Sequence, residues 1–411
     1  MSPRRYEESH PWITFHYDPH FDQTSALLGE AFSKCQHLAG TPLQPGLATR
    51  LSSVYLVKGA VATTAIEGNT LTEAEVHELL DHRKQLPPSQ KYLQQEVDNV
   101  IAALSRIDAS AKQDRTLKIT PGWIKEQNAR IQAGLELADH VVPGEYTDTP
   151  LAVGSVYRGA PPGDIPHLME RLCDWLNVWT GPLQDPNTPA DIRFFQSFFA
   201  AVLGHLYLAW IHPFGDGNGR TARILECALL AHSGVVPWVS SNLLSDHYNR
   251  TRTRYYQKLD EASKTGNPRN FVAYSAQGFV DMLREQIADV QLMQRRTAWV
   301  NFVHHQFQNE PAGETQQRRR MLALTLEPGM PTPAREIRRL NVDLAAMYAR
   351  KEQKTVTRDL NHLLNMRLIR RIGNGYLPNI EVMDAFLPGA QAQPVGLPEP
   401  PEFPNQGTLF D

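Results

Sequence analysis

The sequence predicts a mainly helical protein with one β-hairpin near its middle and a small α+β region towards its C-terminal end. Apolar residues recur at helical spacing through most of residues 48–297. Residues 140–163 interrupt this pattern, because Pro and Gly cluster there around short β-prone runs. Residues 368–372 and 376–380 flank an Asn-Gly turn, which is typical of a second hairpin.

The composition limits the classes of function. The chain has 411 residues, of which 41% are hydrophobic, so two or three domains with real cores are expected. The net charge of -3 gives the whole chain no bias towards nucleic acid or membranes. The 3 cysteines are far apart and form neither a zinc motif nor a disulfide framework. Since no run reaches about 18 apolar residues and no apolar leader is present, we expect a cytoplasmic protein without membrane contact.

The helical period recurs in separate stretches along the chain. Helices are expected over residues 48–66, 70–81, 89–107, 120–134, 165–179, 191–210, 245–263, 270–297, 318–327, 333–340 and 354–365. Thr72 and Glu75 form a capping box, and Thr120-Pro121 starts a helix with a cap followed by proline. The helix over 191–210 is apolar on nearly all sides, which predicts a central, buried position and makes His205 a core histidine. For residues 1–47, a short extended piece and irregular packing on the next domain stay open.

A short loop joins two apolar helices at residues 212–223, which read HPFGDGNGRTAR. Its glycines, Gly217 and Gly219, allow a tight backbone whose amides would point outward from a helix N-terminus, and this is a ready anion site. Arg220 and Arg223 share a face of that helix, and arginine suits bidentate contact with phosphate. The loop therefore predicts a phosphate site.

Two further side chains of the loop add chemistry to this site. Asp216 is a hard oxygen ligand of the kind that holds Mg²⁺ beside substrate phosphates, and His212 titrates near neutral pH. A plain turn is the simplest alternative. A calcium loop fails, because Arg220 and Cys227 occupy places where it needs acidic ligands. The combination predicts phosphoryl or nucleotidyl transfer to a hydroxyl.

The same stretch resembles the signature of the Fic (filamentation induced by cAMP) family, HxFx(D/E)GNGRxxR, and every fixed position matches. Members of this family mostly transfer AMP from ATP to a Ser, Thr or Tyr hydroxyl of a target protein. The resemblance makes His212 the base that deprotonates the hydroxyl and Asp216 the residue that holds Mg²⁺. It implies phosphate binding by Gly217, Asn218, Gly219, Arg220 and Arg223.

Glu67 ends the helix over 48–66, where a carboxylate faces the negative end of the helix dipole and calls for a cation. Residues 63–68, TTAIEG, resemble the inhibitory motif (S/T)xxxE(G/N) of Fic proteins with an N-terminal inhibitory helix. That resemblance pairs Glu67 with Arg223, so that ATP would bind with its α-phosphate out of line with the hydroxyl. In some relatives the same glutamate supports removal of AMP, so de-AMPylation is a second expected activity. Release of inhibition by dissociation of a homodimer and by target binding both stay open.

Two other places resemble parts of the family fold. The hairpin within 140–163 resembles the flap over the active site, and a plain surface hairpin is the alternative. The flap positions near the nucleotide are Val153, Gly154, Ser155 and Val156. Tyr255 and Tyr256 resemble the part that packs against adenine, and ordinary helix packing is the alternative.

The C-terminal region differs from the rest in charge and pattern. Three short helices and the hairpin resemble a winged helix, and residues 314–380 hold about 13 Lys/Arg against about 6 Asp/Glu. DNA binding is one expectation, and dimerisation or docking is the other. The expected domains are 1–110 (helical region with the inhibitory helix), 111–290 (Fic catalytic core), 291–385 (linker helix and winged helix) and 386–411 (disordered tail).

The leading hypothesis is an autoinhibited protein adenylyltransferase that uses ATP and Mg²⁺ and modifies a target protein and itself. UMP or another phosphate-containing group stays open as the transferred group. The alternative is a nucleotide-sensing DNA-binding regulator that acts through the winged helix. The presence of both His212 and Asp216 favours the enzyme.

Overall fold

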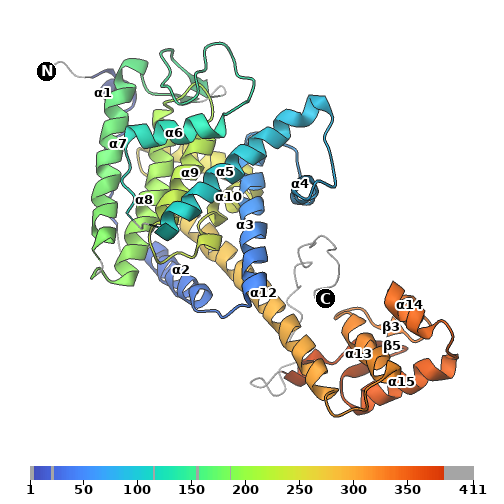
Figure 1. Cartoon of the computed structure of the whole chain (residues 1–411). Helices are drawn as coiled ribbons and strands as arrows, with labels where there is room; N and C mark the ends of the chain where they lie inside the picture. Colours follow the sequence, from blue (N-terminus) through green and yellow to red (C-terminus); the bar gives the residue numbers. More distant parts are fainter. Residues whose placement is uncertain (1–3, 20–22, 114–115, 154–156, 186, 384–411) are drawn as a thin grey trace. The chain divides into compact units, whose positions relative to one another are not determined.

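The computed structural model describes residues 4–19, 23–113, 116–153, 157–185 and 187–383, and it is mostly helical (Figure 1). Contacts within the chain define two compact units, one that ends at Ile287 and one that begins at Ala288. Helix α12 (Arg269–Gln306) contributes residues to both units. A mainly helical fold with small antiparallel sheets is what the sequence predicts.

The first unit contains the helices that precede and surround the signature loop. They are α1 (Arg5–Ser9), α2 (Gln23–Ala39), α3 (Pro45–Ile66), α4 (Glu73–Leu80), α5 (Lys91–Gln113), α6 (Pro121–Ile131), α7 (Ile165–Thr180), α8 (Ala190–Ile211), α9 (Asn218–Ala231), α10 (Leu243–Arg250) and α11 (Arg252–Thr265). Short 3₁₀ turns occur at Pro88–Gln90, Pro162–Asp164, Gly181–Gln184 and Trp238–Ser240. Thr72 and Glu75 form the predicted capping box of α4, and Thr120 caps α6 ahead of its proline.

Helix α8 is the buried centre of the first unit. It packs against α7 and α9, and Phe194 and Phe198 contact Phe279 of α12. Within the described residues, α8 alone is long and apolar enough to cross a membrane, yet 83% of its apolar window is buried inside the protein. The predicted central, buried position of this helix is confirmed.

A second cluster of apolar side chains lies between α3, α5 and α9. Val57 and Val61 of α3, Val100 and Leu104 of α5 and Ile224 of α9 belong to it. In Figure 1, α9 lies beside α8, and α3 and α5 follow on the other side of α9. The boundary expected at residue 110 falls inside α5, and helices α3 and α9 share one core.

Some helices differ from the expected ones. The described part of residues 1–47 contains helices α1 and α2 and the start of α3, and Phe15 packs between Trp175 and Tyr207. The helix expected over 245–263 is two helices, because Thr251 leaves helical geometry between α10 and α11. No Gly or Pro marks this break, so the residue pattern reads as continuous.

The predicted central hairpin is present as strands β1 (Ala152–Val153) and β2 (Tyr157–Arg158), which pair antiparallel. The Tyr157 hydroxyl donates to the Trp210 carbonyl at 2.5 Å, which anchors β2 to the end of α8. Three of the expected flap positions, Gly154, Ser155 and Val156, lie outside the described residues, as does the side chain of Val153.

The second unit is a small α+β unit. Its elements are α13 (Glu314–Thr325), β3 (Thr332–Pro333), α14 (Val342–Tyr348), α15 (Gln353–Asn365), β4 (Ile369–Ile372) and β5 (Gly375–Pro378), with 3₁₀ turns at Ile337–Arg339 and Ile380–Met383. The sheet order is β3-β5-β4, all antiparallel, and its β4–β5 pair is the predicted Asn-Gly hairpin. The helix expected over 333–340 is wrong: only Ile337–Arg339 is helical there, and α14 follows after its cap Asn341. The winged helix itself stays a prediction.

Candidate active site

The loop between α8 and α9 is shaped by two residues with left-handed backbones. His212 ends α8 with φ 51° and ψ 59°, and Gly217 precedes α9 with φ 76°. A left-handed backbone costs a non-glycine residue about 1–2 kcal/mol, and such geometry tends to occur at functional sites. The Asn218 side chain closes the loop, because its Oδ1 accepts from the Phe214 amide at 2.9 Å and its Nδ2 donates to the Phe214 carbonyl at 2.7 Å.

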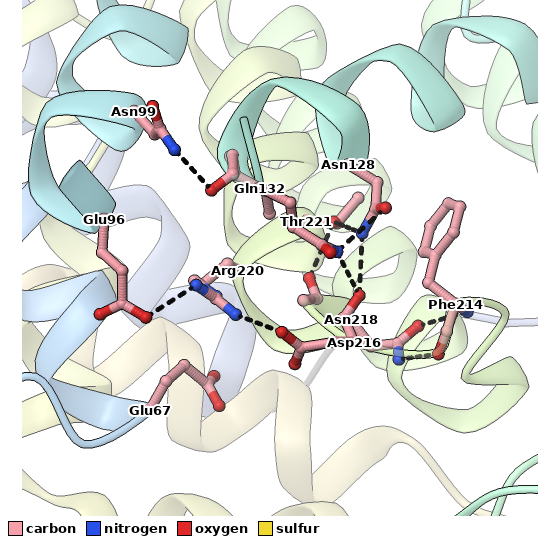
Figure 2. A network of polar contacts seen from close by, with 12 residues as sticks. Glu67, Glu96, Asn99, Asn128, Gln132, Phe214, Asp216, Asn218, Arg220 and Thr221 are labelled. Atoms are coloured by element: carbon pink, nitrogen blue, oxygen red, sulfur yellow. Dashed lines mark hydrogen bonds and ion pairs between the residues drawn. The ribbon is translucent and has the colours of Figure 1, made fainter. Parts of the chain in front are cut away.

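Side chains of α6 and of Gln132, which caps its C-terminal end, hold the same loop from the other side. Asn128 Nδ2 and Gln132 Nε2 both donate to the Asp216 carbonyl, at 3.0 and 2.6 Å (Figure 2). Asn128 Nδ2 also donates to Thr221 Oγ1 at 3.1 Å. A Cβ on Gly217 would approach Gln132 Nε2 to 2.7 Å, so the close approach of this amide requires glycine. The loop is therefore fixed before any ligand binds.

His212 lies half-buried where α8 ends. Burial lowers the pKa of its imidazole, and the Ala209 carbonyl and the carboxylates of Glu67 and Asp216 offset this only in part. The ring is therefore neutral near pH 7, which is the form that accepts a proton. Gly159, just after β2, leaves room for His212, since a Cβ there would lie 3.1 Å from the His212 Cβ.

Glu67 and Arg223 form the pair that the sequence predicts. Arg223 Nη2 donates to Glu67 Oε1 at 2.6 Å and to the Thr63 carbonyl at 3.0 Å, and the guanidinium is almost fully buried. A Cβ on Gly219 would overlap Glu67 Oε1. The carboxylate thus lies against the first turn of α9, whose amides have no intrahelical acceptor. Glu67 occupies the place where the sequence predicts an anion.

The electrostatics of the site keep this pair charged. Burial raises the pKa of the Glu67 carboxyl, but Arg223, Arg220 and Arg252 outweigh burial, so the pKa lies below its ordinary value. A carboxylate with a lowered pKa keeps its ion pair at neutral pH and loses it only as the pH falls through that lowered value. The Glu67 carboxyl is therefore ionised at neutral pH, as an ion pair with Arg223 requires.

Arg220 lies beside Arg223 and contacts two carboxylates. Its Nη2 is 3.0 Å from Asp216 Oδ2, and its Nη1 is 3.2 Å from Glu96 Oε1 of α5. The Asp216 side chain is 47% exposed. Within the described residues no group of three or more metal-ligating side chains occurs. A single half-exposed carboxylate beside an anion site fits Mg²⁺ that takes its other ligands from phosphates and water.

The two tyrosines differ in their surroundings. Tyr255 is buried, its hydroxyl lies 2.9 Å from His205 Nε2, and its ring stacks on Tyr248. Tyr256 is 43% exposed, and its hydroxyl donates to the Ile66 carbonyl at 3.4 Å. Tyr256 therefore has free surface beside Glu67, whereas Tyr255 belongs to the buried network around His205.

The structure thus brings together the signature residues, Glu67 and Tyr256. Sequence reasoning missed Glu96, Asn99, Asn128 and Gln132, which support the loop through side-chain hydrogen bonds. Asn99 Nδ2 donates to the carbonyls of Ile131 and Ala133 at 3.2 and 2.8 Å, which fixes the end of α6 to α5. The available sequence signal was weak. Glu96, Asn99 and Asn128 lie among apolar residues on the inner faces of α5 and α6, and Gln132 directly follows α6.

Fold and site together define a helical protein with an anion site at the N-terminus of α9. The Glu67 carboxylate occupies this site, and the neutral imidazole of His212 lies near it. Residues 118–230 match the Fic/DOC family model, so the chain carries a Fic domain. The protein adenylyltransferase Fic of Drosophila grimshawi is 32% identical over 214 residues, which are 52% of this chain and 39% of that protein. The protein adenylyltransferase fic-1 of Caenorhabditis briggsae is 31% identical over 52% of this chain and 38% of its own length. The matched part of the chain therefore spans just under two fifths of the length of these relatives.

Solved structures show the same fold. A Fic family protein from Desulfovibrio desulfuricans G20 has a TM-score of 0.52 and 21% identity, and the match covers 86% of this chain and 94% of that one. Fic-1 from C. elegans has a TM-score of 0.50 and 25% identity, and the match covers 66% of this chain and 74% of that one. The first likeness supports the fold of the chain beyond the Fic domain.

Proposed function

We propose that this protein transfers AMP from ATP to a Ser, Thr or Tyr hydroxyl of a target protein and of itself, and that Glu67 holds it in an inhibited state. The observation that carries the proposal is the position of the Glu67 carboxylate. It accepts a hydrogen bond from Arg223 and lies against Gly219 at the start of α9. A carboxylate there competes with phosphate for the same donors. The relatives named adenylyltransferases support AMP as the transferred group.

The proposed reaction uses the loop as follows. Neutral His212 accepts the proton of the target hydroxyl, and the oxygen attacks the α-phosphorus of ATP. The bond from the α-phosphorus to the bridging oxygen of the β-phosphate breaks, so pyrophosphate leaves and the proton remains on His212. The α9 amides, Arg220 and Arg223 hold the phosphates. Mg²⁺ held by Asp216 would neutralise phosphate charge when bound.

Inhibition follows from competition for Arg223. While Glu67 occupies its guanidinium, the γ-phosphate lacks that ligand and the α-phosphate lies out of line with the hydroxyl. The same carboxylate, 33% exposed, is available to orient a water, so de-AMPylation belongs to the proposal. Release of Glu67 by dimer dissociation or by target binding is part of it too. Transfer of UMP or a related group is a variant of this function, and the labelling assay distinguishes it when α-labelled UTP replaces α-labelled ATP.

The first test replaces Glu67 by glycine. We expect label from α-labelled ATP with Mg²⁺ to enter the Glu67→Gly protein about a hundredfold faster than wild type, because a misplaced α-phosphate costs on that order. Asp81→Gly is the matched control, since Asp81 likewise follows a helix, α4, and pairs with an arginine, Arg83, at 2.6 Å. Equal labelling of wild type and Glu67→Gly would refute the inhibition. Failure of every folded form to take label from ATP would refute AMP transfer.

A second candidate function is DNA binding by the second unit, and the exposed face of α15 favours it. Lys354, Thr357, Arg358 and Asn361 are exposed on that face. Asp359, the acidic residue of α15, points inward to Arg318 and Arg319. The exposed face thus carries only basic and neutral hydrogen-bonding side chains, which suit phosphates and base edges.

This candidate predicts salt-dependent binding of duplex DNA by the full chain. We expect Lys354→Glu/Arg358→Glu to weaken binding and to reduce the slope of log affinity against log salt by about 2, because two phosphate contacts are lost. Arg50→Glu/Lys91→Glu makes the same charge change in the first unit and is expected to have a smaller effect. Fluorescence anisotropy with a labelled random duplex measures both. Equal binding by all three proteins would argue against this surface and for a docking role.

A further inference from the structure

Arg220, the first arginine of the signature helix, is held from two sides by carboxylates, one from the adjoining loop and one from the distant helix α5. Figure 2 shows it between Asp216 of the loop and Glu96 of α5. Its side chain is only 6% exposed. A guanidinium with so little access to water requires protein acceptors, and the loss of one is costly. Glu96 is therefore part of what keeps this cation where it lies.

Glu96 also contacts the segment that carries Glu67. Its Oε2 accepts from Asn69 Nδ2 at 2.9 Å, and Asn69 lies two residues after Glu67. Asn69 Nδ2 donates to the Leu93 carbonyl at 2.8 Å as well, and its Oδ1 accepts from the Leu71 amide at 3.0 Å. The two oxygens of Glu96 thus link Arg220 to the turn after α3.

Glu96 and Asp216 both contact Arg220, so either carboxylate can serve as its anionic partner. Without Glu96, Asp216 would be the remaining carboxylate on Arg220, and a nearly buried cation would compete strongly with any metal for it. With Glu96 present, Arg220 would keep an anionic partner if Asp216, the more exposed of the two, turned to a cation. Glu96 and Asn99 are three residues apart and lie on the same face of α5. One face of this helix therefore supports both the loop and its arginine.

We propose that Glu96 is a positioning residue that holds Arg220 for a nucleotide phosphate and, through Asn69, joins it to the turn that carries Glu67. This rests on the proposed function, because it takes Arg220 as a phosphate ligand. The inhibitory turn, α5 and the signature helix then form one polar unit. Loss of Glu96 loosens the turn and misplaces the arginine together.

The first arm of the test measures Mg²⁺–ATP affinity by calorimetry in the Glu67→Gly background. We expect Glu96→Ala to raise the Kd about tenfold, because a charge-assisted hydrogen bond to Arg220 is lost. Glu96→Gln is expected to stay within about threefold, since its amide oxygen still accepts from Arg220. Asp108→Ala is the matched control: Asp108 lies on α5, pairs with Lys112 and is 20% exposed, against 19% for Glu96. A merely structural role would not be rescued by glutamine.

The second arm uses no nucleotide. In otherwise wild-type protein, amide exchange of Leu71 is expected to rise about tenfold in Glu96→Ala, because the Asn69 turn loses a charge-assisted hydrogen bond, and to stay unchanged in Asp108→Ala. Unchanged exchange would overturn the link to the turn. Unchanged ATP affinity in Glu96→Ala, with a parent that binds ATP, would overturn the role of Glu96 and leave the proposed function standing. A Glu67→Gly parent that binds no ATP would overturn the proposed function and this proposal with it.

Discussion

Replacement of His212 by alanine in the Glu67→Gly background is expected to lower the rate constant of AMP transfer by about 10² to 10⁴, the usual contribution of a general base. His212 begins the loop and lies outside the amide cradle and the two arginines, so ATP affinity is expected to change little. Single-turnover transfer of label from α-labelled ATP, together with calorimetric ATP binding, separates these effects.

His77→Ala is the matched control for this substitution. His77 on α4 is likewise half-buried, and burial likewise lowers the pKa of its imidazole. Transfer by Glu67→Gly/His212→Ala within about threefold of its parent would show that His212 is not the base, since a lost base costs far more.

The pH dependence of the same variant tests the imidazole directly. Burial lowers the pKa of His212, and the Glu67 charge, which raises it, is absent from Glu67→Gly. The active form is neutral, so the rate constant is expected to stay flat through pH 7 and to fall only below the ordinary histidine value of about 6.5. A decline that begins above that value would contradict the assignment.

The sequence was most informative where a local pattern forces the structure. The left-handed backbone at position 217 favours glycine, and α8 is apolar on nearly all sides, so the loop between two buried helices follows from residues that are adjacent in the chain. The acidic end of α3 predicts a cation partner in the same way. Electrostatics alone requires such a partner, and the resemblance of residues 63–68 to the inhibitory motif identified it as Arg223.

The missed features depend on contacts between distant parts of the chain. Glu96 and Asn128 are polar residues on the inner faces of their helices, and their partners are 124 and 88 residues away. The break at Thr251 has no Gly or Pro signal, so tertiary packing decides it, whereas α14 has a local signal in its cap Asn341. A residue pattern predicts which face of a helix is buried, but it does not predict which polar groups of other elements that face contacts.

The second unit depends on one buried charge, and Asp359→Ala is expected to lower its free energy of unfolding by about 3–5 kcal/mol. Arg318 Nε donates to Asp359 Oδ2 at 2.8 Å, Arg319 Nε donates to Oδ1 at 2.9 Å, and the Tyr348 hydroxyl donates to Oδ2 at 3.0 Å. Removal of the carboxylate leaves these donors, and the buried charge of Arg318 above all, without their anion.

Amide exchange over residues 314–325 and 353–365 of the full chain reports this loss, because these helices carry both sides of the contact. Asp343→Ala, at an exposed acidic position of α14, is the control and is expected to stay within about 0.5 kcal/mol. Asp359→Leu/Arg318→Met tests the cause, since replacement of both charges by apolar groups is often neutral and is expected to recover most of the stability. If the double variant is as unstable as Asp359→Ala, packing rather than the unpaired charge explains the loss. AMP transfer is expected to survive all three changes, because its residues lie in the first unit.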